Sequence, residues 1–338
     1  MVRSVINVKD HGAVGDGVAD DTIKLQNAMG VIPSTGGTVG LPIGKYDDTG
    51  TLLCSITGSH VLGVGKRASM FYFNPTSNKP LLSFTAGAST LSLCSVRHLS
   101  MYGQGAFQKI GIQMSDGSDF LVEDVEIINW IGNGSIGLQT KGRDILTLRK
   151  FRCYADRPIS IEENPNLAGT AADHFHFSDI YLVVESPTQD CITIAPDMQV
   201  NNLTLDGFQS WCKGRHGLYY NDAQAPGTTN LSLHIVNVRR EQSDDPTGYT
   251  AYVNHPFKSV LVENVKCDVT ARGFYFRKID GLTIQNCYYN GTGEAFNADS
   301  TCGNIVFINF IRNPLSSMTM TGLTKTFDQP PIEIWQPS

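Results

Sequence analysis

The sequence predicts an all-β solenoid, in which short strands stack into successive coils. Short segments of alternating apolar and polar residues recur between positions 110 and 313, and their starting points lie 26, 23, 33, 26, 33, 23 and 22 residues apart. Each repeat contains a second such segment, which includes a turn residue. A period in the twenties with two-residue alternation inside it is typical of stacked β-coils, and the two longer steps indicate insertions. The first segments cover residues 110–113, 136–139, 159–162, 192–195, 218–221, 251–254, 274–277 and 296–299.

The turn residue in the second segment indicates a sharp bend between two strands. Asn, Asp and Gly tolerate left-handed backbone angles, and stacked Asn side chains can hydrogen-bond from coil to coil. Lys150 occupies this position in one repeat, which predicts that the turn is not uniform. The other repeats carry Asp124, Asp179, Gly207, Asn237, Asn264, Asn286 and Asn309.

Composition narrows the class of partner. The chain has 338 residues, 41% of them hydrophobic, and a net charge of −6, which argues against nucleic acid or an anionic membrane as the ligand. No run of eighteen apolar residues and no signal-peptide core is present, so no membrane insertion is expected. The eight cysteines show no metal-binding spacing; Cys153 and Cys267 occupy apolar positions, and we expect reduced core thiols rather than disulfides.

The first fifty residues predict a strand, a loop, a helix and a second strand. Residues 6–8 form the strand, and Asp20 or Asp21 caps a helix over residues 22–29. The candidate apolar positions of this helix are Ile23, Leu25, Ala28 and Met29. Because the end of a solenoid exposes unpaired strands, we expect the helix to cover the first coil.

These residues also carry a family resemblance. The run Ile-Asn-Val-Lys-Asp-His-Gly-Ala-Val-Gly-Asp-Gly at 6–17, the Asp-Asp-Thr at 20–22 and the Gly-Gly-Thr-Val…Leu-Pro…Gly-Lys-Tyr pattern at 36–46 resemble the entry segment of the pectate-lyase-3-like superfamily. Gly40 departs from the family pattern, which usually has an aromatic residue there. The resemblance implies a right-handed, single-stranded parallel β-helix of the kind found in polysaccharide lyases, glycoside hydrolases and bacteriophage tailspikes. It transfers no catalytic residue.

The predicted organisation is an entry segment and capping helix at 1–50, a parallel β-helix at 51–313 and a tail at 314–338. The tail leaves the repeat, and it either caps the far end or contacts neighbouring chains. The insertions are expected at 164–172, 222–228 and 243–248, on loops that either line a binding face or are neutral surface loops.

Alternation predicts three stacked tyrosines on one outer face. Tyr219, Tyr252 and Tyr275 occupy the outward position of consecutive coils, roughly 4.8 Å apart. Aromatic faces beside polar groups suit sugar rings, although a structural aromatic ladder or a contact between subunits gives the same pattern. The polar residues expected beside them as substrate-binding groups are Arg215, His216, Asp222 and Arg277.

Three carboxylates are the candidates for glycosidic hydrolysis, which needs one protonated and one ionised carboxyl about 5 to 9.5 Å apart. Glu162 ends one strand, Asp190 precedes the strand of the next coil, and Asp156 is the corresponding turn residue one coil earlier. The alternative for each of the three is a solvated turn carboxylate without a catalytic role. A lyase would instead need a base and a cation to neutralise a uronate, for which Arg215, His216, Arg272 and Arg277 are available, with Ca²⁺ as a further option. No calcium-ligand spacing is visible, and we expect no metal or other cofactor.

The resemblance and these residues together predict a tailspike-like depolymerase that hydrolyses a bacterial surface polysaccharide, a capsule or an O-antigen. A polysaccharide lyase acting on a uronate-containing glycan and a non-catalytic glycan-binding stalk are the alternatives. The resemblance implies a homotrimer in a virion tail that acts at the bacterial surface; a secreted bacterial enzyme is the other setting.

Overall fold

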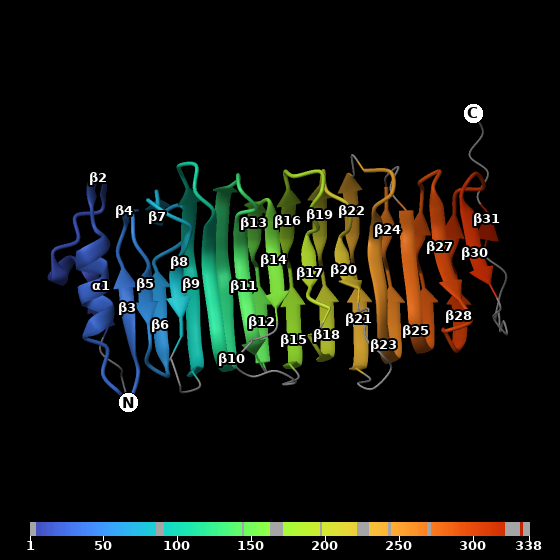
Figure 1. Ribbon diagram of the computed structural model, residues 1–338, viewed down its shortest axis with the longest axis horizontal. Coiled ribbons are helices and arrows are strands. Elements are labelled where there is room, and N and C mark those ends of the chain that lie inside the picture. The colour runs from blue at the N-terminus through green and yellow to red at the C-terminus, as the bar shows by residue number, and fades with distance from the viewer. Residues whose placement is uncertain are drawn as a thin grey trace. The chain divides into compact units, whose positions relative to one another are not determined.

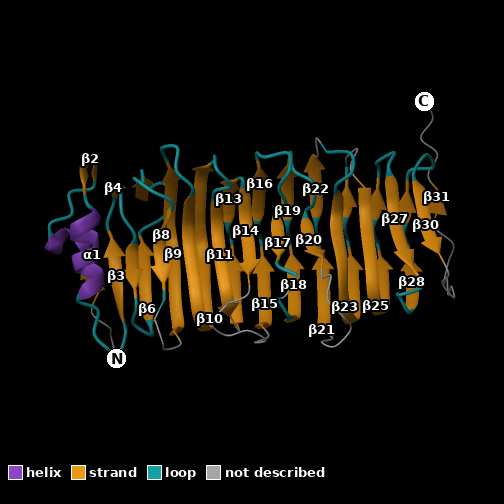
Figure 2. Ribbon diagram, in the orientation of Figure 1, coloured by secondary structure: helices purple, strands orange, loops and turns teal. Residues whose placement is uncertain are grey.

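The computed structural model describes residues 5–85, 91–143, 145–162, 172–196, 198–221, 230–242, 245–268, 272–321 and 332–333. The predicted all-β class is confirmed: parallel strands stack as a β-helix, and α1 (Thr22–Gly30) is the one α-helix of the described residues (Figure 1; Figure 2). The chain divides into two compact units, unit 1 with residues 1–168 and unit 2 with residues 169–338. The predicted boundaries at 50 and 313 stay predictions.

Unit 1 consists of three parallel ladders, because each coil contributes one strand to each ladder. Ladder 1A contains β5 (Leu52–Cys54), β8 (Lys79–Phe84), the start of β10 (Lys109–Trp130), β11 (Ile136–Arg143) and β14 (Arg157–Glu162). Ladder 1B contains β1 (Val5–Asn7), β3 (Gly37–Leu41), β6 (Ser59–Gly63), the start of β9 (Leu91–Gly103), the middle of β10 and β12 (Ile145–Arg149). Ladder 1C contains β2 (Asp16–Asp20), β4 (Gly44–Asp48), β7 (Ser69–Phe73), the ends of β9 and β10, and β13 (Arg152–Ala155).

Unit 2 has the same construction. Ladder 2A contains β17 (Ile192–Ile194), β20 (Leu218–Asn221), the starts of β23 (Tyr249–Glu263) and β25 (Arg272–Gln285), β27 (Glu294–Asp299) and β30 (Ser317–Thr321). Ladder 2B contains β15 (Ala172–Ser178), β18 (Val200–Asp206), β21 (Asn230–Val236), the ends of β23 and β25, and β28 (Asn304–Ile308). Ladder 2C contains β16 (Tyr181–Val184), β19 (Gln209–Cys212), β22 (Arg239–Gln242), β24 (Lys266–Cys267), β26 (Tyr288–Tyr289), β29 (Ile311–Arg312) and β31 (Ile332–Glu333).

The predicted left-handed turns are confirmed, and the exception made for Lys150 was wrong. Asn237, Asn264 and the other turn residues have φ between 51° and 67°, and Lys150 shares this conformation with φ 53°. The geometry of the coil therefore sets the turn, and the lysine is held in an unfavourable backbone region. The predicted amide ladder also forms: the Asn264 side chain donates to Asn237 at 3.2 Å, and Asn309 donates to Asn286 at 3.2 Å.

One predicted register is wrong by two residues. Ile159 pairs with Leu138 rather than with Ile136, and Glu162 pairs with Lys141 rather than with Gln139. A slip of two residues keeps every side chain on the same face of the strand, so the alternation in the sequence contains no signal against it.

The helix agrees with its predicted span, but one of its predicted core residues is exposed. Leu25, Ala28 and Met29 are buried at helical spacing, whereas Ile23 is 72% exposed because it lies on the opposite side of the helix from Leu25. Asp20 accepts a hydrogen bond from the Thr22 N–H at 2.9 Å, and the Asp21 side chain makes no cap bond to the helix. The helix packs on β5, where Gln26 bonds the backbone of Leu53; its predicted covering of the first coil stays a prediction. A short 3-10 helix, η1 (Val8–His11), precedes it.

The thiols behave as predicted where they are described. Cys153 and Cys267 are fully buried, and none of the seven cysteines whose side chains are described forms a disulfide. No helix among the described residues has the length and hydropathy needed to cross a membrane. The expected insertions at 164–172 and 222–228 lie outside the described residues apart from Ala172, as does most of the 314–338 tail beyond residue 321. Of the third expected insertion, 243–248, only residues 243–244 lie outside; residues 245–248 form a turn in which the Gly248 N–H donates to the Asp245 carbonyl at 3.2 Å.

Candidate functional site

The three predicted tyrosines are brought together on ladder 2A. Tyr219 pairs with Tyr252, and Tyr252 pairs with Tyr275, in the register of β20, β23 and β25. The rings of Tyr252 and Tyr275 are parallel to within 2° with centroids 4.2 Å apart, and those of Tyr219 and Tyr252 lie 5.3 Å apart. The alternation that buries Leu218 and Tyr220 directs Tyr219 outward. The result is a continuous aromatic surface, which we call the tyrosine ladder.

Two of the predicted arginines lie on this ladder. The Arg277 guanidinium is 4.0 Å from the ring centroid of Tyr275, and that of Arg215 is 5.5 Å from the ring of Tyr219. Arg277 also pairs with Asp299 at 2.8 Å and donates to Asn297 at 2.6 Å, so its position is fixed from three sides. Arg277 Nη1 also donates to the Phe276 carbonyl at 2.8 Å, so hydrogen bonds and the cation–π contact together orient this guanidinium against the Tyr275 ring.

A second column of polar residues runs beside the ladder, and most of it was missed from sequence. Its members each precede the first apolar residue of a ladder 2A strand by two positions, and this spacing is the signal that would have found them. Only Asp190 and His216 were predicted as site residues, and Arg272 was considered only for a lyase. This polar column consists of Asp190, His216, Tyr249, Arg272 and Glu294.

The centre of the polar column is a hydrogen-bonded triad. The Tyr249 hydroxyl donates to Glu294 Oε2 at 2.6 Å and accepts from Arg272 Nη1 at 3.0 Å. Burial raises the pKa of Tyr249 to about 12, and the hydrogen bond to Glu294 adds to this effect. Burial disfavours ionisation of Glu294, but hydrogen bonds from Thr319, Tyr249 and Asn297 together lower its pKa. Tyr249 is therefore a neutral phenol at pH 7 that touches both an ionised carboxylate and a guanidinium.

An open pocket of about 620 Å³ adjoins this triad. Arg272 and Glu294 line it, so both charged members of the triad face a space large enough for a sugar residue. Its remaining walls are Pro246, Thr292, Gly293, Asn297, Leu315 and Ser317.

His216 and Asp190 form a buried support at the other end of the column. Asp190 accepts from the His216 backbone N–H at 3.0 Å and from Arg215 at 3.2 Å. Burial lowers the pKa of His216 to about 3, and its Nδ1 accepts from the Tyr249 backbone N–H at 2.9 Å. The imidazole is therefore neutral with its proton on Nε2, and it can donate a hydrogen bond but has no ring nitrogen left to act as a base. Burial raises the pKa of Asp190 to about 6.

The other predicted catalytic carboxylates lie in unit 1. Asp156 accepts three hydrogen bonds from the backbone of the turn at 132–135, and Glu162 accepts from Gln139 and Ser160 at 2.9 Å. These two carboxylates flank β14, and a strand rises about 3.3 Å per residue, so they lie too far apart to form a hydrolytic pair with each other. Asp190 belongs to unit 2. The catalytic roles of all three stay predictions, and Asp222 lies outside the described residues.

No group of three or more His, Cys, Asp or Glu suited to hold a metal occurs among the residues that the structure describes. The expectation of no cofactor stays a prediction.

Comparisons of sequence and of structure with known proteins both support the parallel β-helix fold. Residues 5–55 match a family described as rhamnogalacturonase A/epimerase, pectate lyase-like. Mannuronan C5-epimerase AlgE2 of Azotobacter vinelandii is 42% identical over 66 residues, which are 18% of this chain and 7% of that protein. The chain thus spans a small part of the length of this curated relative.

Solved structures with the same fold include enzymes. The family 28 exopolygalacturonase of Yersinia enterocolitica has a TM-score of 0.62 at 11% identity, over 96% of this chain and 77% of that one. The enzymatically active domain of tailspike protein 2 of bacteriophage CBA120 has a TM-score of 0.53 at 14% identity, over 97% of this chain and 47% of that one. The pectate-lyase-like, tailspike-like parallel β-helix expected from the entry segment is confirmed at the level of the fold.

Proposed function

We propose that ladder 2A binds a polysaccharide whose sugars carry carboxylates, and that the chain degrades this polysaccharide. The observation that carries the proposal is the tyrosine ladder with Arg277 at 4.0 Å from the Tyr275 ring, directly beside the pocket that Arg272 and Glu294 line. Flat aromatic rings match the C–H faces of sugars, and guanidinium groups pair with carboxylates. The epimerase and the exopolygalacturonase that resemble this chain are named for uronate polymers, which supports the same class of ligand.

The triad supports β-elimination best among the reactions that cleave such a chain. The Tyr249 oxygen would take the proton from C5 of the uronate while its own proton passes to Glu294 Oε2 along the 2.6 Å hydrogen bond. The electron pair then forms the C4–C5 double bond and breaks the bond from C4 to the leaving oxygen, which takes a proton from water. Arg272 bonds the Tyr249 oxygen and holds it in place, and because Arg272 also lines the pocket it would stabilise the negative charge that develops on the uronate carboxylate as C5 loses its proton.

Hydrolysis through paired carboxylates remains the second candidate, and one observation favours it. The pKa of Asp190 is raised to about 6, as a general acid requires. Glu294 cannot be its partner, because the two lie four coils apart in the polar column, about 19 Å at the usual strand spacing. Glu162, the partner predicted from the sequence, stays a prediction.

Product analysis separates the two reactions. The chain is incubated with polygalacturonate, alginate and acidic bacterial capsules, and the fragments are measured by mass spectrometry and ultraviolet absorbance. Elimination gives absorbing fragments without added water, whereas hydrolysis gives fragments heavier by one water. We expect elimination, and Tyr249→Phe and Glu294→Gln should each lower the rate by about 10²-fold or more. Tyr288→Phe, on ladder 2C, is the control. Full activity in both triad variants would refute the elimination mechanism.

The tyrosine ladder is tested separately from the chemistry. Tyr252→Ala removes the central ring, and loss of one stacking surface should weaken glycan affinity about fivefold to tenfold. Binding without chain shortening by any glycan would favour a non-catalytic stalk. Unchanged affinity in the Tyr252 variant would assign the ladder to packing alone.

The phage tailspike with the same fold supports a place in a virion tail at the bacterial surface. A homotrimer is the assembly implied by that resemblance, and sedimentation equilibrium tests it: a mass of one chain at all concentrations would contradict it.

A further inference from the structure

A second cationic and aromatic surface lies on ladder 1C of unit 1. Its outward positions form two neighbouring columns. Ser100, Glu126 and Arg152 pair in one column, and Tyr72 and Tyr102 pair in the next. The rings of Tyr72 and Tyr102 are parallel to within 12° with centroids 5.1 Å apart.

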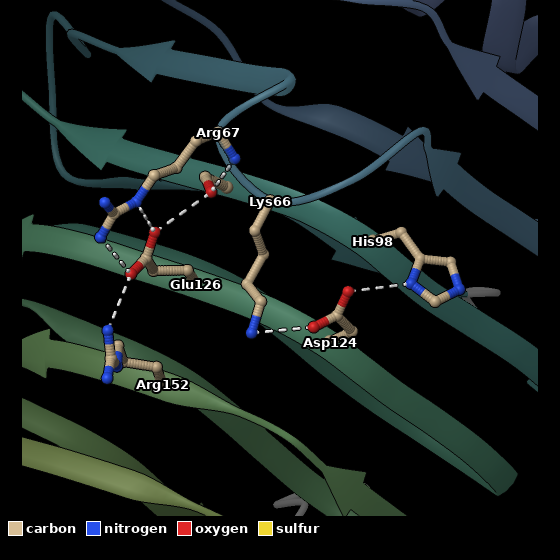
Figure 3. Close-up of polar contacts among 7 residues, drawn as sticks. Lys66, Arg67, His98, Asp124, Glu126 and Arg152 are labelled. Carbon is tan, nitrogen blue, oxygen red and sulfur yellow. Dashed lines mark hydrogen bonds and ion pairs between the residues drawn. The ribbon is translucent and has the colours of Figure 1, made fainter.

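A buried carboxylate holds two arginines beside these rings. Glu126 is only 3% exposed, and Arg67 approaches both of its oxygens, with Nε 3.2 Å from Oε2 and Nη2 3.3 Å from Oε1. Arg152 Nη1 lies 3.5 Å from the same Oε1 on the other side. Figure 3 shows the two guanidinium groups converging on Glu126 from opposite directions. Ser100 also holds Arg67 in place, because the Arg67 backbone N–H donates to Ser100 Oγ at 3.0 Å.

The group contains one more positive charge than an ion pair, because two arginines share one carboxylate. One carboxylate neutralises one guanidinium, so the Arg67–Glu126–Arg152 group keeps a net positive charge on a chain whose total is −6. The two arginine side chains are 66% and 44% exposed, so a ligand in solution can reach both of them, whereas Glu126 is buried. The neighbouring Lys66, Asp124 and His98 form a separate group in which Asp124 already contacts both Lys66 and His98 (Figure 3).

The aromatic pair lies within reach of this charge. Ser100, which accepts the Arg67 backbone N–H, and Tyr102 lie two positions apart on β9, so both face the same side of ladder 1C. Lys45 adds a further cation 5.7 Å above the Tyr72 ring. Stacked rings flanked by oriented cations match a sugar that carries a carboxylate: the ring stacks, and the carboxylate takes the outer guanidinium N–H groups.

We propose that Tyr72, Tyr102, Arg67 and Arg152 form a second binding site for a carboxylated saccharide, with Glu126 as the residue that positions both arginines. This site does not depend on cleavage at ladder 2A. It would hold an acidic polysaccharide on unit 1 whatever reaction unit 2 performs.

The test is calorimetric titration of the full chain with a short oligogalacturonate, with its carboxyl-reduced form as the uncharged probe. Arg67→Gln and Tyr102→Ala should each weaken binding at this site about tenfold, and the titration should lose one of two binding events. Arg149→Gln is the matched control, because Arg149 is 49% exposed and pairs with Glu123 on a different ladder. Glu126→Gln should weaken binding although Glu126 is too buried to touch the ligand, and its melting temperature is recorded alongside.

Three outcomes would overturn the proposal. They are unchanged oligogalacturonate affinity in both Arg67→Gln and Tyr102→Ala, an equal loss in Arg149→Gln, and equal binding of the carboxyl-reduced probe. Cleavage assays on the same variants keep the two sites apart: activity should persist in Arg67→Gln if the ladder 2A proposal holds, and loss of cleavage in Tyr249→Phe should leave binding on unit 1 intact.

Discussion

Substitution of Asp156 tests whether this carboxylate, predicted from the sequence to be catalytic, instead stabilises the fold. It is 7% exposed, and its Oδ2 accepts from the backbone N–H groups of Gly132 at 2.9 Å, Gly134 at 3.1 Å and Ser135 at 3.3 Å. Gly132 and Gly134 have φ values of 94° and 70°, with Asn133 at 56° between them. Successive N–H groups in such a turn form a concave anion-binding site, and the Asp156 carboxylate occupies it.

The cost of removing this carboxylate follows from those contacts. A hydrogen bond to a charged group contributes about 1.5–3 kcal/mol, and a buried donor left without an acceptor costs about 1–3 kcal/mol. Because the three bonds share one oxygen and water can replace part of them, we expect Asp156→Ala to lower the unfolding free energy by about 3 kcal/mol. Asp156→Asn keeps an acceptor oxygen but loses the charge, so about 1 kcal/mol is expected.

Urea unfolding followed by circular dichroism measures both variants, with the exposed Asp280→Ala as the control. Polysaccharide cleavage is assayed on the same samples at a temperature where each remains folded. We expect destabilised variants with unchanged activity per folded molecule. Wild-type stability together with abolished cleavage in Asp156→Asn would refute this reasoning and support the catalytic role predicted from the sequence.

Two further predictions concern stability. Asp48 is fully buried, and burial raises its pKa from 3.8 to about 7, so the stability due to its uncharged form is fully present below pH 3.8 and is lost as the pH rises through 7. Asp48→Asn should remove this part of the pH dependence and raise the melting temperature above pH 7; parallel melting curves for both proteins across this range would contradict it. Gly137→Ala places a methyl group 2.2 Å from Cys153 Sγ and 2.7 Å from the Pro158 carbonyl, so overpacking should cost about 1–3 kcal/mol in urea unfolding. Gly281→Ala is the control, because the added methyl group would lie 3.5 Å from its nearest neighbour, and it should lower the unfolding free energy by less than about 1 kcal/mol. Equal destabilisation by the two substitutions would refute the packing argument.

The sequence by itself determined the fold class and the tyrosine ladder, because both depend on a strict two-residue alternation repeated in register. Tyr219, Tyr252 and Tyr275 follow the same spacing from the apolar residue of each row, so stacking the rows necessarily aligns them. The left-handed turns were equally predictable, since Asn237 and Asn264 are residue types that tolerate that conformation.

Only the tertiary structure decided which polar groups meet. The Tyr249 hydroxyl reaches Glu294 from two coils away, and Asp156 bonds a turn of the preceding coil, so neither partner is a neighbour in sequence. Alternation states on which side of a strand a residue lies, but a slip of two residues leaves that side unchanged, which is why Glu162 was placed opposite Gln139 instead of Lys141. The strengths of hydrogen bonds and ion pairs depend on distances of a few ångströms between atoms of neighbouring coils, and these distances are set only when the coils stack.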